Sequence, residues 1–71
     1  MVKSTINVSY GHAQIFYNWY VPFKLQGNIE VQHWCSRQFK QFDWYPCYQI
    51  MGIDEGYHFV NQRDALLFEL R

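Results

Sequence analysis

The sequence of 71 residues has few cysteines, prolines and glycines, and neither charge is in excess. Two cysteines are too few for the disulfide scaffold that stabilises many small secreted domains. Lys plus Arg and Asp plus Glu number six each, so the formal net charge is zero. This balance argues against a protein whose main work is neutralising phosphates, and against an acidic mimic of DNA. No apolar run approaches the roughly eighteen residues of a membrane-spanning helix.

The residues after Met1 lack the apolar run that a secretory signal needs. We therefore expect a cytoplasmic protein in which Cys35 and Cys47 are reduced thiols, in preference to a disulfide. The four glycines are too scattered along the chain to form a phosphate-binding loop.

Aromatic residues are what the sequence has in abundance: three Trp, six Tyr and six Phe make up 21% of the chain. Its length limits it to a single domain, residues 1–71, which needs large side chains to build a stable core. So small a domain cannot bury that many rings, so some must reach the surface, where an aromatic patch usually marks a partner. Zero net charge also favours self-association, so a homo-oligomer is a second expectation.

The N-terminal part is predicted to form a strand and then a short helix. Polar and apolar residues partly alternate over Lys3–Tyr10, which is typical of a half-buried strand. Gly11 and His12 interrupt this pattern. Over Ala13–Tyr20 the apolar side chains recur at helical spacings, which favours a helix of about two turns that Pro22 ends.

The middle of the chain fits more than one structure. Residues 29–34 alternate as in a strand, whereas Val31, Trp34 and Cys35 also fall on one helical face. We favour a strand or irregular extended segment, because Val, Trp and Phe prefer strands and the signals for a helix cap are weak. Residues 37–43 are expected to form a loop or a hairpin connection.

The C-terminal part has the clearest pattern. Residues 44–51 predict a strand with Pro46 near its start, and residues 52–56 predict a compact hairpin loop with Gly at both ends. Tyr57–Val60 returns as an antiparallel strand, and Asn61 is a favourable N-cap for a closing helix. The apolar side chains of this helix are expected to pack mostly on the sheet: Leu66, Leu67, Phe68 and Leu70.

The predicted order is therefore β-α-β-β-α, with one further extended segment in the middle. This is an α+β fold: a small sandwich in which helices cover one face of an antiparallel sheet, close to a truncated ferredoxin-like chain.

The end of the chain follows a definite order of residue types. An aromatic strand residue is followed by polar residues, Asp-Ala, two apolar residues, Phe, a charged residue, Leu and Arg: Phe59, Asn61-Gln62-Arg63, Asp64-Ala65, Leu66-Leu67, Phe68, Glu69 and Leu70-Arg71. This block resembles the ends of small uncharacterised proteins of tailed bacteriophages, especially those of cyanobacteria and marine bacteria. The resemblance implies a viral origin, and hence the host cytoplasm as the place of action. It brings no catalytic residues.

Two sets of residues in the sequence could in principle form a metal site or a catalytic site. His33, Cys35, Cys47 and His58 could supply four zinc ligands, but their spacing differs from that of compact structural zinc sites. Cys47 with His58 and Asp54 could form a nucleophilic triad, yet no family signature surrounds either cysteine. We therefore expect no metal, no cofactor and no enzymatic activity, with both cysteines as small core residues.

Rings on two neighbouring predicted strands raise the alternative of a single-stranded nucleic-acid platform, on which bases would stack. The rings are Tyr45, Tyr48, Tyr57 and Phe59. The basic side chains that could meet phosphates are Arg37, Lys40 and Arg63. Two observations argue against this alternative. Rings on a sheet usually face a core, and the chain has no excess of basic residues.

We expect the partner-binding surface in the aromatic and charged centre of the chain, because Trp, Tyr and Arg dominate binding hot spots. The expected binding residues are Trp34, Arg37, Phe39, Lys40, Phe42, Trp44 and Tyr45. Against this, any one of these rings could simply fill the core.

The function that follows is that of a small phage-encoded, non-enzymatic binding protein. It modulates or inhibits a host protein or complex, in host takeover or counter-defence. A nucleic-acid-binding module and a self-assembling or minor structural phage protein are the alternatives.

Overall fold

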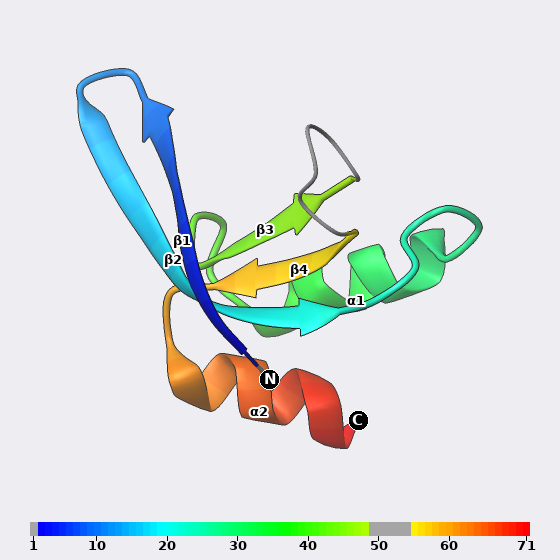
Figure 1. Ribbon diagram of the computed structural model, residues 1–71. Helices are drawn as coiled ribbons and strands as arrows, with labels where there is room; N and C mark the ends of the chain where they lie inside the picture. Colours follow the sequence, from blue (N-terminus) through cyan, green and yellow to red (C-terminus); the bar gives the residue numbers. More distant parts are fainter. Residues whose placement is uncertain (1, 49–54) are drawn as a thin grey trace.

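The computed structural model describes residues 2–48 and 55–71, and these form six elements in the order ββαββα (Figure 1). The strands are β1 (Val2–Tyr10), β2 (Ala13–Pro22), β3 (Trp44–Cys47) and β4 (Gly56–Phe59). The helices are α1 (Ile29–Gln38) and α2 (Gln62–Leu70). The described strands form one antiparallel sheet in the order β1-β2-β4-β3. The predicted α+β class is confirmed, whereas two individual elements differ from the prediction.

The first difference is that residues 13–20, predicted as a helix, belong to strand β2. The strand pairs with β1 along its length, with one shift in register between Lys3 and Ile6. Gly11 has a φ of 64°, the left-handed conformation that a tight hairpin connection favours. Ile, Phe, Tyr, Trp and Val all pack well on a pleated surface, so pairing with β1 outweighs the helical spacing that the same residues also show.

The second difference is that residues 29–34, for which we favoured an extended segment, belong to helix α1, and the helix also takes in Arg37 and Gln38, which we expected in a loop or hairpin connection. Cys35 is fully buried, and Val31 and Trp34 pack against the same core, so the alternative helical face is the one that forms. The helix ends at Gln38, and the C-cap residue Phe39, whose backbone is extended, donates its N–H to the carbonyl of Cys35 at 3.0 Å. Burial of one face thus decides a segment whose intrinsic preference points to a strand.

The C-terminal prediction is largely confirmed, except that Gly56, predicted as the end of the hairpin loop, is the first residue of β4. Strands β3 and β4 pair antiparallel, with Trp44 opposite Phe59 and Cys47 opposite Gly56, and Asn61 occupies the N-cap position of α2. The parts of the predicted strand and hairpin loop that fall on residues 49–54 lie outside the described residues.

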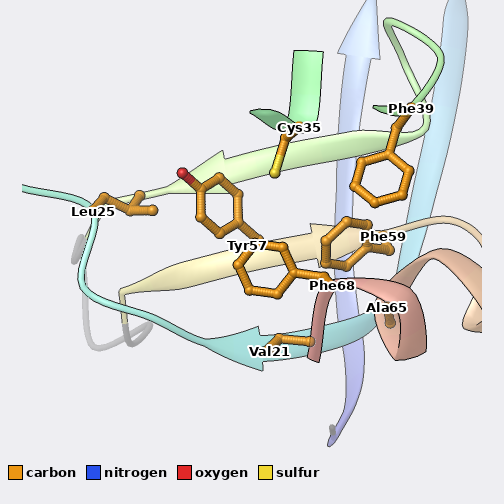
Figure 2. Close-up of a cluster of buried hydrophobic side chains, with 8 residues drawn as sticks. All are labelled: Val21, Leu25, Cys35, Phe39, Tyr57, Phe59, Ala65 and Phe68. Carbon is orange, nitrogen blue, oxygen red and sulfur yellow. The ribbon is translucent and has the colours of Figure 1, made fainter. Parts of the chain in front are cut away.

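Both helices pack on the sheet face that carries Tyr57 and Phe59, two fully buried rings of β4 (Figure 2). The ring centroid of Phe68 in α2 lies 5.0 Å from that of Tyr57 and 5.6 Å from that of Phe59. Phe39, at the end of α1, lies 5.3 Å from Phe59. The rest of this buried cluster is Val21, Leu25, Cys35 and Ala65. Contacts between tilted rings add about 0.5–1.5 kcal/mol each beyond the area they bury.

Helix α2 buries fewer apolar side chains than the sequence predicts. Ala65 and Phe68 face the core, whereas Leu66, Leu67 and Leu70 are exposed, Leu70 to 82%. The expectation that these leucines pack mostly on the sheet is therefore wrong. The buried positions of α2 lie three to four residues apart, so the residues between them necessarily point away from the sheet.

Candidate functional site

The structure divides the seven predicted binding residues into three groups. Trp34, Phe39 and Trp44 belong to the core between the helices and the sheet, where Phe39 is buried and the two indoles are half-buried. Tyr45 lies on the opposite face of the sheet, since it pairs with His58 instead of the inward-facing residues of β4. The third group reaches solvent: Arg37, Lys40 and Phe42.

The exposed group lies where α1 runs into β3, next to a shallow depression of about 280 Å³ lined by Ser36, Gln41 and Trp44. We call this the α1–β3 surface, and it consists of Ser36, Arg37, Lys40, Gln41, Phe42 and Trp44. Sequence reasoning missed Ser36 and Gln41, and nothing in their local sequence distinguishes them from other polar residues on the surface. Their place beside the depression follows only from how the helix meets the strand.

Phe42 is exposed to 44%, yet both its backbone and its ring are held in place. The hydroxyl of Tyr17 in β2 donates to the carbonyl of Phe42 at 2.9 Å. The ring of Tyr10 in β1 lies 4.8 Å from the Phe42 ring, and its hydroxyl lies 3.1 Å from that of Tyr17. Burial, followed by the hydrogen bond with Tyr10, raises the pKa of Tyr17, so its phenol keeps the proton that it donates.

The same connection is tied to the rest of the sheet through its backbone. The N–H of Asp43 donates to the carbonyl of Lys40 at 3.0 Å, and the N–H of Val60 donates to the carbonyl of Asp43 at 3.0 Å. These bonds close a turn before β3 and fix it to the end of β4. Phe42 therefore lies on a turn whose backbone is fixed by hydrogen bonds to the rest of the sheet.

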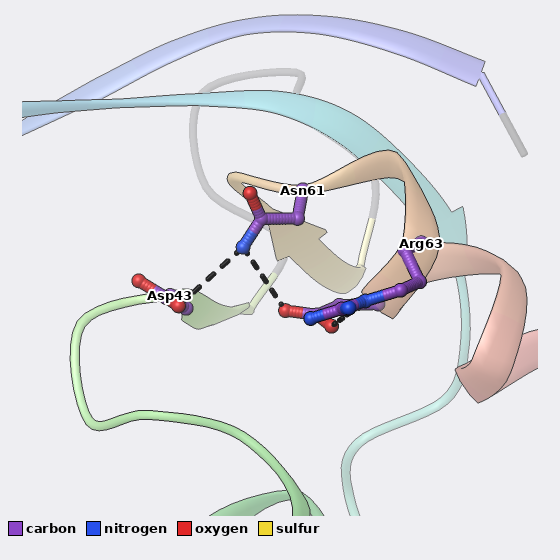
Figure 3. A network of polar contacts seen from close by, with 4 residues as sticks. Asp43, Asn61 and Arg63 are labelled. Atoms are coloured by element: carbon purple, nitrogen blue, oxygen red, sulfur yellow. Dashed lines mark hydrogen bonds and ion pairs between the residues drawn. The ribbon is translucent and has the colours of Figure 1, made fainter.

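A polar network joins this turn to the start of α2 (Figure 3). The side-chain amide of Asn61 donates to the carboxylate of Asp43 at 3.4 Å and to that of Asp64 at 3.2 Å. The Nε atom of Arg63 lies 3.9 Å from the Asp64 carboxylate. Asn61 thus occupies the predicted N-cap position without bonding a backbone N–H through its side chain. Its amide instead holds two carboxylates together, which makes the network a structural link.

His58 is a buried titratable residue of β4 that faces away from the helices. It is 2% exposed, stacks on Tyr20 at 4.8 Å between ring centroids, and its Nδ1 lies 2.9 Å from Oγ of Ser4. Its Nε2 has no hydrogen-bond partner among the described residues. Burial lowers the pKa of His58 from 6.5 to about 4, so the imidazole is neutral at pH 7.

The two constellations with metal or catalytic chemistry can now be placed. Cys35 and Cys47 are buried free thiols, while His33 is exposed on α1. Within residues 2–48 and 55–71, no three His, Cys, Asp or Glu side chains lie close enough together to hold a metal ion. Burial raises the pKa of Cys35 to about 12 and raises that of Cys47, which disfavours the thiolate that a nucleophile needs. Asp54, the third member of the written triad, lies outside the described residues.

The four rings of the nucleic-acid alternative do not share a face. Tyr57 and Phe59 are fully buried under the helices and cannot stack bases in the folded chain. Tyr45 is half-buried on the other face, with its ring 5.5 Å from that of Tyr17. Tyr48 is exposed. The described part of the chain therefore offers no sheet platform made of these four rings.

Comparison of the chain with protein-family models, curated proteins and solved structures gives no match. Among the described residues, no helix is long and apolar enough to cross a membrane.

Proposed function

We propose that this chain is a small phage-encoded, non-enzymatic binding protein that recognises a host protein in the host cytoplasm through its α1–β3 surface, and so modulates or inhibits it. The observation that carries the proposal is the exposed but fixed ring of Phe42. An aromatic side chain already held in one conformation loses little entropy on binding, which otherwise costs about 0.5–1.5 kcal/mol per immobilised side chain.

The charges around Phe42 indicate the kind of partner. Arg37 and Lys40 are exposed, whereas Asp43 is turned toward Asn61. An aromatic anchor flanked by two cations fits a partner with an apolar pocket edged by Asp or Glu. The depression beside Trp44 offers room for one side chain of the partner in return. The viral origin and the host target rest on the resemblance of the C-terminal block to phage proteins.

The test is capture of a partner from bacterial lysate by the tagged chain, with two matched variants. Phe42→Ala removes the proposed anchor, while Phe16→Ala removes a ring of β2 that is similarly exposed, at 53%. We expect the partner to bind the wild type and Phe16→Ala alike, and to bind Phe42→Ala roughly thirtyfold more weakly, a loss of about 2 kcal/mol. A wild-type chain that is folded but captures nothing above background would contradict the proposal, as would a Phe42→Ala variant that binds normally.

Tyr17→Phe tests whether fixing Phe42 is what counts. This substitution removes the hydroxyl that donates to the Phe42 carbonyl and leaves the Phe42 ring in place. We expect a partial loss of affinity, smaller than that of Phe42→Ala, together with a loss of about 1–3 kcal/mol in stability because a carbonyl loses its donor. Unchanged affinity for the captured partner would show that the anchor need not be held.

The exposed leucines of α2 favour a second candidate function, self-assembly. Leu66, Leu67 and Leu70 lie within one turn of each other on the helix surface, and the chain has zero net charge to keep copies apart. We propose that this stripe holds two copies together. Light scattering across a concentration series is expected to show a dimer that Leu67→Glu converts to a monomer. A wild-type monomer at every concentration would exclude this candidate.

A further inference from the structure

Three aromatic rings from three different segments surround the guanidinium group of Arg71. The Cζ atom of Arg71 lies 5.0 Å from the ring centroid of Phe23, 5.7 Å from that of Trp34 and 4.5 Å from that of Phe68. Phe23 precedes α1, Trp34 lies on α1 and Phe68 lies on α2. A cation within about 6 Å of a ring centroid is attracted by the negative face of the ring. We call these three rings the aromatic cage.

The walls of this cage are set at angles to one another by the core. The rings of Phe23 and Phe68 meet edge to face at 5.4 Å and 83°, and those of Trp34 and Phe68 at 6.2 Å and 61°. Phe68 is buried, and its ring packs on Tyr57, which is fully buried (Figure 2). Phe68 is thus part of the core, and the half-buried rings of Phe23 and Trp34 pack against that core.

The charge of Arg71 also acts on two buried groups of the core. The hydroxyl of Tyr57 is buried and has no hydrogen-bond partner among the described residues. Burial raises the pKa of Tyr57 to about 12, and the charge of Arg71 opposes this rise. The same charge opposes the rise in the pKa of Cys35. The preference of the site for a cation rests on the three ring faces around the guanidinium group.

Arg71 itself lies at the surface. It lies beyond the last residue of α2 and is exposed, and a cation–π contact is weaker at an exposed site than in a desolvated one. A second cation of the same shape can therefore replace it without disturbing the core. A guanidinium group is planar and stacks on ring faces, which an ammonium group does not do.

We propose that Phe23, Trp34 and Phe68 form a binding site for a guanidinium group, and that Arg71 is its intramolecular occupant. The incoming group is either the arginine side chain of a partner protein or a free guanidinium compound, and it binds when Arg71 swings out. The site does not include Phe42, so it can be tested apart from the proposed function.

The experiment uses the full chain with Arg71→Ala, which empties the cage without touching its walls. Ethylguanidinium is titrated while the indole N–H signals are followed by NMR, with the signals of Trp34 and Trp19 assigned by Trp→Phe variants. We expect saturable movement of the Trp34 signal with a Kd on the order of 10 mM. The wild type is expected to bind at least about fivefold more weakly, because Arg71 competes.

Trp19 is the internal control, since among the described residues one cation lies over its ring, with Nζ of Lys3 at 5.2 Å from the centroid. Equal movement of the Trp19 and Trp34 signals would overturn the site, as would no saturation in Arg71→Ala or equal binding by wild type and variant.

A short arginine peptide and the same peptide with lysine in place of arginine are titrated in the same way. Tighter binding of the arginine peptide than of ethylguanidinium assigns a protein source, and equal binding assigns a free compound. Equal binding of the two peptides would overturn the preference for guanidinium.

Discussion

The stability of this chain is expected to fall with acidity because of His58. The imidazole is 2% exposed, stacked on Tyr20, and bonded at Nδ1 to Ser4, while Nε2 has no partner among the described residues. A second proton on the ring would place a charge inside the sheet, where Nε2 has no partner among the described residues to stabilise it. The neutral form is therefore the one that the folded chain accommodates.

The sign and the size of the effect follow from the pKa. Burial lowers the pKa of His58 from 6.5 to about 4 in the folded chain. Between these two values the unfolded chain holds more protons than the folded one, so the free energy of unfolding decreases as the pH falls through this range and levels off below it. The difference in pKa corresponds to about 3 kcal/mol. A domain of this size has roughly 4–11 kcal/mol in total, so the loss is a large share.

The assay is urea unfolding followed by tryptophan fluorescence at pH 7, 6, 5 and 4, on the wild type and on His58→Gln. Glutamine keeps hydrogen-bonding groups but does not titrate, and the carboxylates that titrate in this range are common to both chains. We therefore expect the difference in stability between the two chains to shift by about 2–3 kcal/mol in favour of His58→Gln as the pH falls. Parallel pH profiles, or an imidazole pKa near 6.5 by NMR in the folded chain, would refute the reasoning.

Three further predictions concern stability and reactivity. Gly56→Ala places a Cβ 2.5 Å from the backbone carbonyl of Val21, and is expected to destabilise the chain by about 3 kcal/mol or more in urea unfolding. Gly27→Ala meets no atom within 4 Å and costs only the strain of its φ of 83°, about 1–2 kcal/mol, so similar losses in the two variants would contradict the packing argument. Phe68→Ala is expected to cost about 3–5 kcal/mol, against less than about 0.5 kcal/mol for the exposed Leu70→Ala, and equal costs would contradict the assignment of the buried face of α2. Cys35, with its pKa raised to about 12, is expected to react with a thiol reagent at pH 8 only as fast as the chain opens, whereas fast labelling of the native chain would show an accessible thiol.

The C-terminal part of the fold was predictable because its local signals agree with its tertiary environment. Aromatic residues of β4 prefer a strand, Asn61 is suited to an N-cap, and the residues that follow are strong helix formers. The strand and the helix form as predicted, and Asn61 takes the N-cap position, although its side chain bonds two carboxylates and not a backbone N–H. The prediction of which side of α2 packs on the sheet was wrong. Leu66 and Leu67 are no less apolar than Phe68, and only the contact with β4 decides which of these side chains is buried.

The two wrong elements failed for opposite reasons. Residues 13–20 match a helical spacing by coincidence, because several neighbouring apolar residues satisfy both the period of a helix and that of a strand. Their partner, β1, is next to them in sequence, so a hairpin through Gly11 was the simpler solution. Residues 29–34 alternate as in a strand, but Val31, Trp34 and Cys35 also share one helical face. Packing of Cys35 on the core selects the helix instead.

The composition of the candidate site could be predicted, but its division between surface and core required one further step. Side chains alternate along a strand, so Trp44 and Tyr45 cannot belong to the same face of β3. With Trp44 taken into the core, any partner surface in this region had to lie on the connection before it. This assignment of Trp44 to the core could have been made from the sequence. The hydroxyl of Tyr17 that holds Phe42 comes from 25 residues earlier in the chain, and no local pattern connects the two. An exposed aromatic residue becomes an anchor through such a contact, so the feature that carries the proposed function is also the one that only the fold supplies.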